Sequence, residues 1–511
     1  MKRMIAVTLI LSLCFTILTG CNDNEEIETD DAAVRAAIIE EFNTISKIPR
    51  ESGHERAIST YLRSWAKENG FEVIRDSSNN VIINKPATVG YEKVPTTILQ
   101  CNMDSKIIAA DGFAFDPLND PIQTVVSEDI MRAEGTSLGA DSGIGVATAL
   151  YVLENSQKHG PIRVIFTAGG ESSMMGAEKL NTKHLDGAYL INLGWESDRG
   201  IGVGSGGTAA YNMKHEIEWV PPQNAIPYLL SISGLVGGDA DEAIGNGGAN
   251  AIKTIGEVLA SAQGKGILFE LGSFNGGISR DTIPDAATAL IIINESDQRK
   301  MQNVVDDAMD VFQDAYGDVE KEYVFTYQEA PMPDKVVSFE DNGSIISFIY
   351  GVINGVQSMS KSYEDVVESA SNLGMVSTAT GNFLAQISAA SNSDVGLYKI
   401  TIAHETISGM SSLEYTYDEG VPRWPDHTDS VLYTSMQEIF SNLYDDEISG
   451  DIVHHELECG WFARKNPRLQ IVSIGPRIDN GNTPGETLIL DTVTKPAKLI
   501  LAFLEQANLK Q

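Results

Sequence analysis

Carboxylate, amide and imidazole side chains recur in short phrases along this 511-residue chain. Asp104 ends the phrase ILQCNMD, Asp141 lies in GTSLGADSGIG, and Glu171 lies in FTAGGESSMMGA. His454 begins HHELECGWF near the C-terminus. Carboxylates and imidazoles are the side chains that hold divalent metals and transfer protons. These phrases are therefore the first candidates for a chemical site.

The elements around these phrases alternate between strands and helices. Apolar runs predict strands at 71–74, 81–83, 97–100, 163–167 and 189–193, and helical spacing predicts helices at 33–48, 54–69 and after Asp141. This alternation indicates an α/β fold with a mostly parallel mixed sheet flanked by helices.

The pattern changes from about residue 208 and returns from about residue 424. Between them lie hairpin-like strands, a Gly-rich stretch at 237–248 and helices at 251–262 and 302–316, while residues 381–405 look irregular. A helix at 430–443, a strand at 469–474 and a helix at 493–506 then follow. We expect one α/β domain, residues 33–208 and 420–511, interrupted by an inserted α+β domain, residues 209–419.

Seven phrases, in this order, resemble the aminoacyl-histidine dipeptidase (Xaa-His dipeptidase) branch of the dizinc exopeptidases over essentially the whole mature chain. They are ISKIPRESGHE, VIINKPA, ILQCNMD, AEGTSLGADSGIGVATAL, FTAGGESSMMGA, SNLGMV and HHELECGWF. The resemblance implies a zinc-exopeptidase-like catalytic domain with two bridged zinc ions, and an inserted lid domain that closes over small peptides. Two metals polarise the scissile carbonyl and activate a shared water, and a carboxylate base takes the proton.

Several site residues keep the residue types of the family. The resemblance assigns metal-ligand positions to Asp141, Glu171 and His454, and the role of an orienting aspartate to Asp104. In the lid, the resemblance of residues 274–277 to an Asn-Gly-Gly phrase implies that Asn275 and Gly276 bind substrate.

Other positions depart from the family pattern. Asn102 stands at a histidine ligand position and Gly194 at an aspartate ligand position. Gly170 stands where the family has its glutamate base, and Asp239 where the lid has a histidine. The late His-Ser-Pro phrase of the family reads Asn482-Thr483-Pro484. The resemblance is therefore to a family member with a degenerate active site.

These departures change the expected metal content and the expected rate. In the family, the residues at positions 102 and 194 bind only one of the two zinc ions. With asparagine and glycine at these positions that zinc loses both ligands, so a two-metal centre is not expected. Asp141, Glu171 and His454 with a water match the ligand count of a catalytic one-zinc site, and manganese or cobalt would also suit these donors. A missing general base costs about 10² to 10⁴ in rate, so we expect peptidase activity to be lost or strongly reduced. Glu196, Asp104 and Glu456 are the candidates to replace the base.

The sequence leaves three functions open. The first is a dipeptidase-family metallopeptidase homologue that binds a small peptide or amino-acid-like ligand without efficient hydrolysis. The second is an active one-metal hydrolase on a changed small amide, and the third is a structural or interaction lipoprotein. The family dimerises through its lid, so a homodimer is expected. The retained Asp141, Glu171 and His454 also allow purely structural roles as a helix cap, a polar contact and a core histidine.

Charge and the N-terminal segment indicate location and exclude one class of partner. A net charge of −35 repels phosphate backbones, so nucleic acid is not an expected partner. Residues 1–21 resemble a lipoprotein signal peptide that ends in Leu-Thr-Gly-Cys, which makes Cys21 the lipidated residue, followed by an acidic tether at 22–32. This indicates a lipid-anchored protein of the bacterial cell envelope, at the outer membrane. Whether Cys101 and Cys459 pair is left open.

Overall fold

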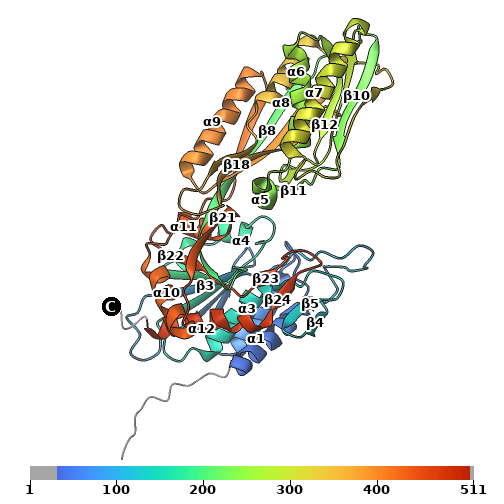
Figure 1. The fold of residues 1–511 in the computed structure, drawn as a ribbon. Helices are drawn as coiled ribbons and strands as arrows, with labels where there is room; N and C mark the ends of the chain where they lie inside the picture. The colour runs from blue at the N-terminus through green and yellow to red at the C-terminus, as the bar shows by residue number, and fades with distance from the viewer. Residues whose placement is uncertain (1–30, 507–511) are drawn as a thin grey trace, which may run out of the picture.

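The computed structural model describes residues 31–506, which form two domains connected through the long strand β8 (Gly200–Glu216) (Figure 1). The proposed signal peptide, Cys21 and nearly all of the acidic tether lie outside the described residues. Within residues 31–506, no helix is long and apolar enough to cross a membrane.

The first domain is a mixed sheet covered by helices on both faces. Its strands lie in the order β1 (Glu72–Arg75), β2 (Val81–Lys85), β6 (Ile162–Thr167), β3 (Thr97–Asn102), β7 (Tyr189–Asn192), β22 (Gln470–Ser473) and β8. The central pairs β6–β3, β3–β7 and β7–β22 are parallel, and β1–β2 and β2–β6 are antiparallel. The α/β class with a mixed sheet and flanking helices is confirmed.

Alternating side chains of these strands enter two apolar cores. Leu99, Cys101 and Phe166 belong to one core, and Ile98 and Ile165 belong to the other. The first core packs against the helices α1 (Asp31–Ser46), α2 (Arg56–Glu68), α3 (Ala140–Asn155), α10 (Val431–Tyr444) and α12 (Thr494–Gln506), and the second against α4 (Met175–Lys179) and α11 (Cys459–Lys465). Cys101 and Cys459 are both buried and free, each in a different core, so they do not pair.

A smaller sheet lies beside α3. Its strands run in the order β23 (Ile478–Asp479), β24 (Thr487–Ile489), β5 (Ile130–Ala133) and β4 (Thr124–Ser127). The pairing of β24 with β5 therefore joins the C-terminal part of the chain to the segment that precedes α3.

The inserted domain is an antiparallel sheet with helices packed against one face (Figure 1). The sheet continues from β8 through β19 (Asn382–Ser391), β18 (Val367–Ser377), β12 (Phe269–Gly276), β14 (Ala287–Ile293), β10 (Ile226–Ser233) and β15 (Val324–Glu329), with β20 (Glu414–Glu419) and β17 (Gly355–Met359) paired beside β8 and β18. Its helices are α5 (Ala240–Ala243), α6 (Ala251–Gly264), α7 (Gln298–Tyr316), α8 (Phe339–Gly351) and α9 (Asp394–Met410). Its apolar core draws on residues from Ala209 to Leu413.

The expected irregularity of residues 381–405 is wrong, because the segment forms β19 and most of α9. In β19 the residues that face the core are Phe383, Ala385, Ile387 and Ala389, and they alternate with half-buried, mostly polar side chains. Alanine at two of these four positions weakens the period-two pattern in the sequence.

Strand β8 belongs to both sheets, and its glycines allow close packing where the domains meet. Its first half pairs in parallel with β21 (Ser449–Glu456), and its second half pairs with β19. A Cβ atom on Gly206 would lie 1.9 Å from the carbonyl oxygen of His454, so only glycine lets β21 approach β8 at this point.

Candidate functional site

The carboxyl ends of β3 and β6 bring two of the sequence phrases together. These strands are parallel neighbours in which Asn102 pairs with Thr167, so the residues that follow each strand meet at one edge of the sheet. Asp104 is fully buried there and accepts hydrogen bonds from the backbone N–H groups of Gly170 (2.9 Å) and Glu171 (3.0 Å) and from the Ser52 hydroxyl. Asp104 therefore fixes the turn that carries Glu171.

Both carboxylate oxygens of Glu171 accept hydrogen bonds from asparagine amides. Asn102 Nδ2 lies 2.8 Å from Glu171 Oε1, and Asn482 Nδ2 lies 3.2 Å from Oε2. Burial, followed by the charges of Asp141 and Asp104, raises the pKa of Glu171 well above its usual range. Three separate segments thus meet at one carboxyl group.

Asp141 lies at the start of α3, beside the same centre. Its Oδ1 accepts a hydrogen bond from Ser142 Oγ at 2.8 Å. Burial is the main cause that raises the pKa of Asp141 to about 6, and the charges of Glu486 and Asp104 add to it. The backbone leaves helical geometry at Asp141 (φ −82°, ψ 117°) and Ser142, so the regular part of α3 begins after these two residues. The alternative role of Asp141 as a helix cap stays a prediction.

The two glycines of the predicted site supply no side chain: Gly194 adds no carboxylate beside Asp141, and Gly170 adds no base beside Glu171. A Cβ atom on Gly194 would lie 3.0 Å from Ser142 Oγ, so a side chain at this position would point to the neighbour of Asp141. A Cβ atom on Gly170 would lie 2.3 Å from the Cβ of Asn102, which leaves no room for any side chain. Gly170 therefore supplies no base, as the sequence predicts, and the packing of Asn102 against it also excludes a larger residue at this position.

Glu196 is one of the three candidate replacement bases, and the charges of Asp141 and Glu486 act on it. Burial, followed by the charges of Asp141 and Glu486, raises the pKa of Glu196 to about 8. A carboxyl group with this pKa is mostly protonated at neutral pH and is then a weak proton acceptor. Asp104 already binds two backbone N–H groups, and Glu456 lies on β21 near Asp239 and Asp281 of the inserted domain.

His454 does not join Asp141 and Glu171, so the predicted three-ligand set is wrong. His454 lies on β21, and its Nδ1 is 3.1 Å from the carbonyl oxygen of Val367 on β18. Burial lowers the pKa of His454 to about 4. Among residues 31–506, no three His, Cys, Asp or Glu side chains form a group that could hold a metal ion. The pairing of β21 with β8 directs His454 toward the inserted domain.

Asn482 is the residue that the sequence analysis did not place in the site. It lies in the turn between β23 and β24 and takes the place beside Glu171 that had been expected for a ligand from the C-terminal part of the chain. The signal was present in the sequence, because the His-Ser-Pro phrase loses its histidine to asparagine, as the phrase at Asn102 does.

The residues of this centre do not fit a zinc site. Around Glu171 and Asp141 the structure offers two carboxylates and two amides whose NH₂ groups face Glu171, with no imidazole. Zinc in proteins is held mostly by thiolate, imidazole and carboxylate, and an NH₂ group directed at a carboxylate competes with a cation for the same oxygen.

A buried arginine lies close to these carboxylates. Arg50 is 2% exposed, and its Nη2 donates a hydrogen bond to the Gly139 carbonyl at 2.6 Å. Burial lowers the pKa of Arg50 to about 10, while the charges of Glu486, Asp104 and Glu171 favour its protonated form. Positive charge at the centre is thus supplied by the chain itself.

The predicted residues of the inserted domain lie near the domain boundary or within its sheet. Asp239 is exposed and caps α5 by accepting a hydrogen bond from Asp241 N at 2.9 Å. Helix α5 packs against β21, where burial lowers the pKa of His455 and the negative charge of Asp239 partly opposes that shift. Asn275 Oδ1 accepts hydrogen bonds from Ser377 Oγ and Thr378 N, and Gly276 packs tightly against neighbouring strands and helix α6.

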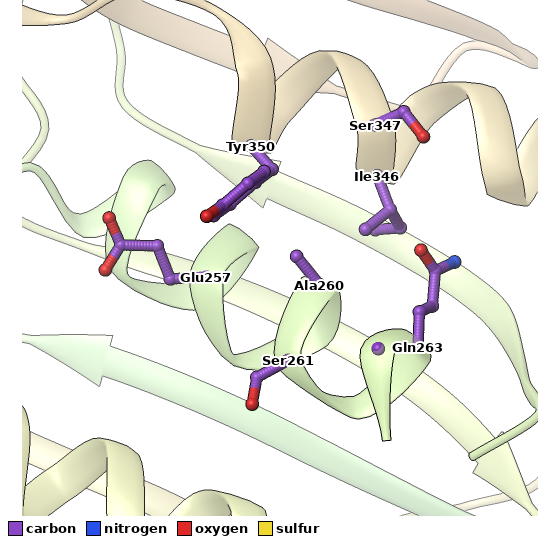
Figure 2. Close-up of a pocket in the computed structure, with 8 residues that line it drawn as sticks. Glu257, Ala260, Ser261, Gln263, Ile346, Ser347 and Tyr350 are labelled. Carbon is purple, nitrogen blue, oxygen red and sulfur yellow. The ribbon is translucent and has the colours of Figure 1, made fainter. Parts of the chain in front are cut away.

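A separate cavity of about 700 Å³ lies between α6 and α8, on the inserted domain (Figure 2). Figure 2 shows Tyr350 and Ile346 of α8 facing Ala260 of α6, with the carboxylate of Glu257 apart from the Ser261 hydroxyl. None of the residues predicted to do chemistry lines this cavity, so it is distinct from the centre around Glu171.

Comparisons with known proteins settle the ancestry of this arrangement. Residues 111–506 match peptidase family M20/M25/M40. The chain belongs to this peptidase family. Members of the M20 family are metal-dependent, typically with zinc. The centre around Glu171 therefore departs from its own family.

Two dipeptidases are similar over nearly the whole chain. The cytosol non-specific dipeptidase of Escherichia coli is 29% identical over 471 residues, which are 92% of this chain and 97% of that protein. The aminoacylhistidine dipeptidase of Vibrio alginolyticus superposes with a TM-score of 0.82 at 30% identity, covering 94% of this chain and 98% of the other. A tripeptidase from Staphylococcus aureus shares the fold with a TM-score of 0.55 at 15% identity, covering 93% of this chain and 99% of the other. The predicted dipeptidase branch of the M20 peptidases is confirmed.

Proposed function

We propose that this chain is a dipeptidase-family protein that binds a small peptide or amino-acid-like ligand and hydrolyses peptides very slowly or not at all. The observation that carries the proposal is the position of Asn102 and Asn482, whose amides bind both oxygens of Glu171. Gly170 provides no base, and Glu196 is a weak one at neutral pH. Loss of the base and of carbonyl stabilisation together predicts a rate at least about 10³-fold below that of an intact relative.

Ligand binding is supported by the conservation of the whole architecture. The superposition covers 98% of the Vibrio dipeptidase chain and 94% of this chain, so the two proteins share one architecture. The second candidate, a one-metal hydrolase, has no specific support because His454 lies with Val367 and away from Glu171.

The test is a paired measurement of hydrolysis and binding. The purified full chain is incubated with a panel of dipeptides, including Xaa-His peptides, with added zinc or manganese, and free amino acids are quantified by chromatography beside the E. coli dipeptidase. We expect no hydrolysis above about one thousandth of the control rate, and an increase in Tm with the peptides that bind. A rate within tenfold of the control would disprove the loss of activity. A panel that never changes Tm would favour the third alternative, a structural or interaction protein.

We also propose that the chain is a lipoprotein of the cell envelope, anchored through Cys21. The support is the Leu-Thr-Gly-Cys sequence after the apolar run of residues 4–18. Mass spectrometry of the N-terminal peptide should find the diacylglyceryl modification on Cys21, and Cys21→Ala should move the protein out of the membrane fraction. Unmodified Cys21 in the mature protein would contradict the anchor.

A homodimer through the inserted domain belongs to the same proposal. Helix α9 exposes the apolar side chains of Val395 (61%), Tyr398 (64%) and Ile402 (42%), which lie on one face of the helix. Light scattering coupled to gel filtration should give twice the monomer mass for the wild-type chain. The Tyr398→Glu variant should give the monomer mass. A monomeric wild-type chain would rule the dimer out.

A further inference from the structure

We infer that Asn102, Glu171 and Asn482 form a metal-free crosslink that takes over the structural work of a metal centre. The inference rests on the proposed function, because a chain that does not hydrolyse peptides has no need of a metal. It goes further by stating what fills the centre and what it holds together.

The crosslink connects three segments that are distant in sequence. Asn102 ends β3, Glu171 lies in the turn after β6, and Asn482 lies between β23 and β24. A metal with ligands from these three segments would tie them together, and two amide–carboxylate hydrogen bonds of 2.8 and 3.2 Å tie them together here.

The same turn is held at a second point. Glu486, four residues after Asn482, accepts hydrogen bonds from the backbone N–H groups of Leu138, Gly139 and Ala140. The turn between β23 and β24 is therefore bound both to the start of α3 and to the turn after β6 by side chains of the protein itself.

The charge that a metal would bring is supplied in part by Arg50. Its buried guanidinium lies within the electrostatic reach of Glu486, Asp104 and Glu171, and it is anchored to the carbonyl of Gly139. A divalent ion added beside Arg50 would be repelled by a fixed positive charge, and it would also have to displace the amide NH₂ groups from Glu171.

The experiment measures the zinc content and the thermal stability of the full chain. The chain is dialysed against Zn²⁺, freed of excess ion, and analysed for metal, and Tm is recorded with EDTA and with Zn²⁺. We expect fewer than about 0.1 zinc per chain and the same Tm in both conditions. Asn102→Ala and Asn482→Ala should each lower Tm by about 3–8 °C, whereas Asn303→Ala, on the exposed face of α7, should change it by less than about 1 °C.

A restored centre provides the positive control. The variant Asn102→His/Gly194→Asp/Asn482→His should bind at least one zinc per chain and should gain Tm when Zn²⁺ is added. About one zinc per wild-type chain that Glu171→Ala removes would overturn the inference, and so would an unchanged Tm in both asparagine variants. These results do not depend on the restored variant folding well.

The outcomes separate this inference from the proposed function. If the wild-type chain holds zinc but does not hydrolyse dipeptides, the crosslink is wrong and the proposed function stands. If a zinc-free chain hydrolyses dipeptides at the rate of the E. coli dipeptidase, the proposed function is wrong and the crosslink stands.

Discussion

Removal of the Glu486 carboxylate is the most direct test of how the site is held together. Glu486 is 1% exposed, and its oxygens accept hydrogen bonds from Leu138 N (2.9 Å), Gly139 N (3.0 Å) and Ala140 N (2.7 Å). Glu486→Ala leaves three buried N–H groups without a protein acceptor, each at a cost of about 1–3 kcal/mol. Because water can enter part of the vacated space, we expect a total loss of about 3–6 kcal/mol in the free energy of unfolding.

Two further variants should lose less stability than Glu486→Ala, in a fixed order. Glu486→Gln keeps one oxygen as an acceptor and puts an NH₂ group against the remaining N–H, so we expect a loss of about 1–3 kcal/mol. Glu447→Ala, at an exposed position before β21, should be neutral within about 0.5 kcal/mol.

The assay is thermal unfolding of the first domain, followed by circular dichroism at one pH and one salt concentration. For a domain of this size 1 kcal/mol corresponds to about 2–4 °C, so a loss of about 3–6 kcal/mol in Glu486→Ala should lower Tm by about 6–24 °C. A Tm within about 2 °C of the wild-type value, or a larger loss for Glu486→Gln than for Glu486→Ala, would refute the reasoning.

Three more predictions concern the centre around Glu171 and the nearby buried Glu458, whose Oε2 accepts hydrogen bonds from Gln100 and Thr167. Gly170→Ala should destabilise by about 1–3 kcal/mol in urea unfolding, because its Cβ atom would overlap Asn102. Arg50→Met should cost about 3–5 kcal/mol in the same assay, since it removes a buried charge that faces several carboxylates. Burial raises the pKa of Glu458 to about 8, so its contribution to stability is complete below the unfolded pKa of about 4.5 and is lost as the pH rises through 8. Tm measured from pH 5 to 9 should therefore fall less in Glu458→Gln than in the wild-type chain.

Regular, strongly apolar elements could be predicted from the sequence within a few residues. The strand expected at 163–167 is β6 (Ile162–Thr167), and the helix expected at 251–262 is α6 (Ala251–Gly264). Elements built from small residues were missed or shortened. Five of the first eight residues of β8 are glycines. The strand depends on its pairing with β21 and β19, and the local sequence does not reveal this pairing.

The order of phrases along the chain predicted part of the site and misplaced one residue. Asn102, Asp104, Gly170 and Glu171 meet because β3 and β6 are parallel neighbours, and a strand followed by a polar residue already indicates this edge. His454 and Asn482 both belong to C-terminal phrases, and the sequence does not tell which phrase returns to the site. The answer depends on the long-range pairing of β21 with β8 and on the turn between β23 and β24.

The retained acidic residues of the centre share one property that Gly170 and Gly194 lack: their carboxylates accept hydrogen bonds from buried donors. Asp104 accepts hydrogen bonds from two backbone N–H groups, and Glu171 accepts them from two asparagine amides. Asp141 accepts a hydrogen bond from the Ser142 hydroxyl. Replacing such an acceptor leaves buried donors unpaired, so these carboxylates contribute to the fold whether or not a metal is bound. Gly170 and Gly194 carry no side chain that could accept such a hydrogen bond. The survival of Asp104, Asp141 and Glu171 is therefore explained by hydrogen bonding alone, and it does not by itself indicate a working metallopeptidase.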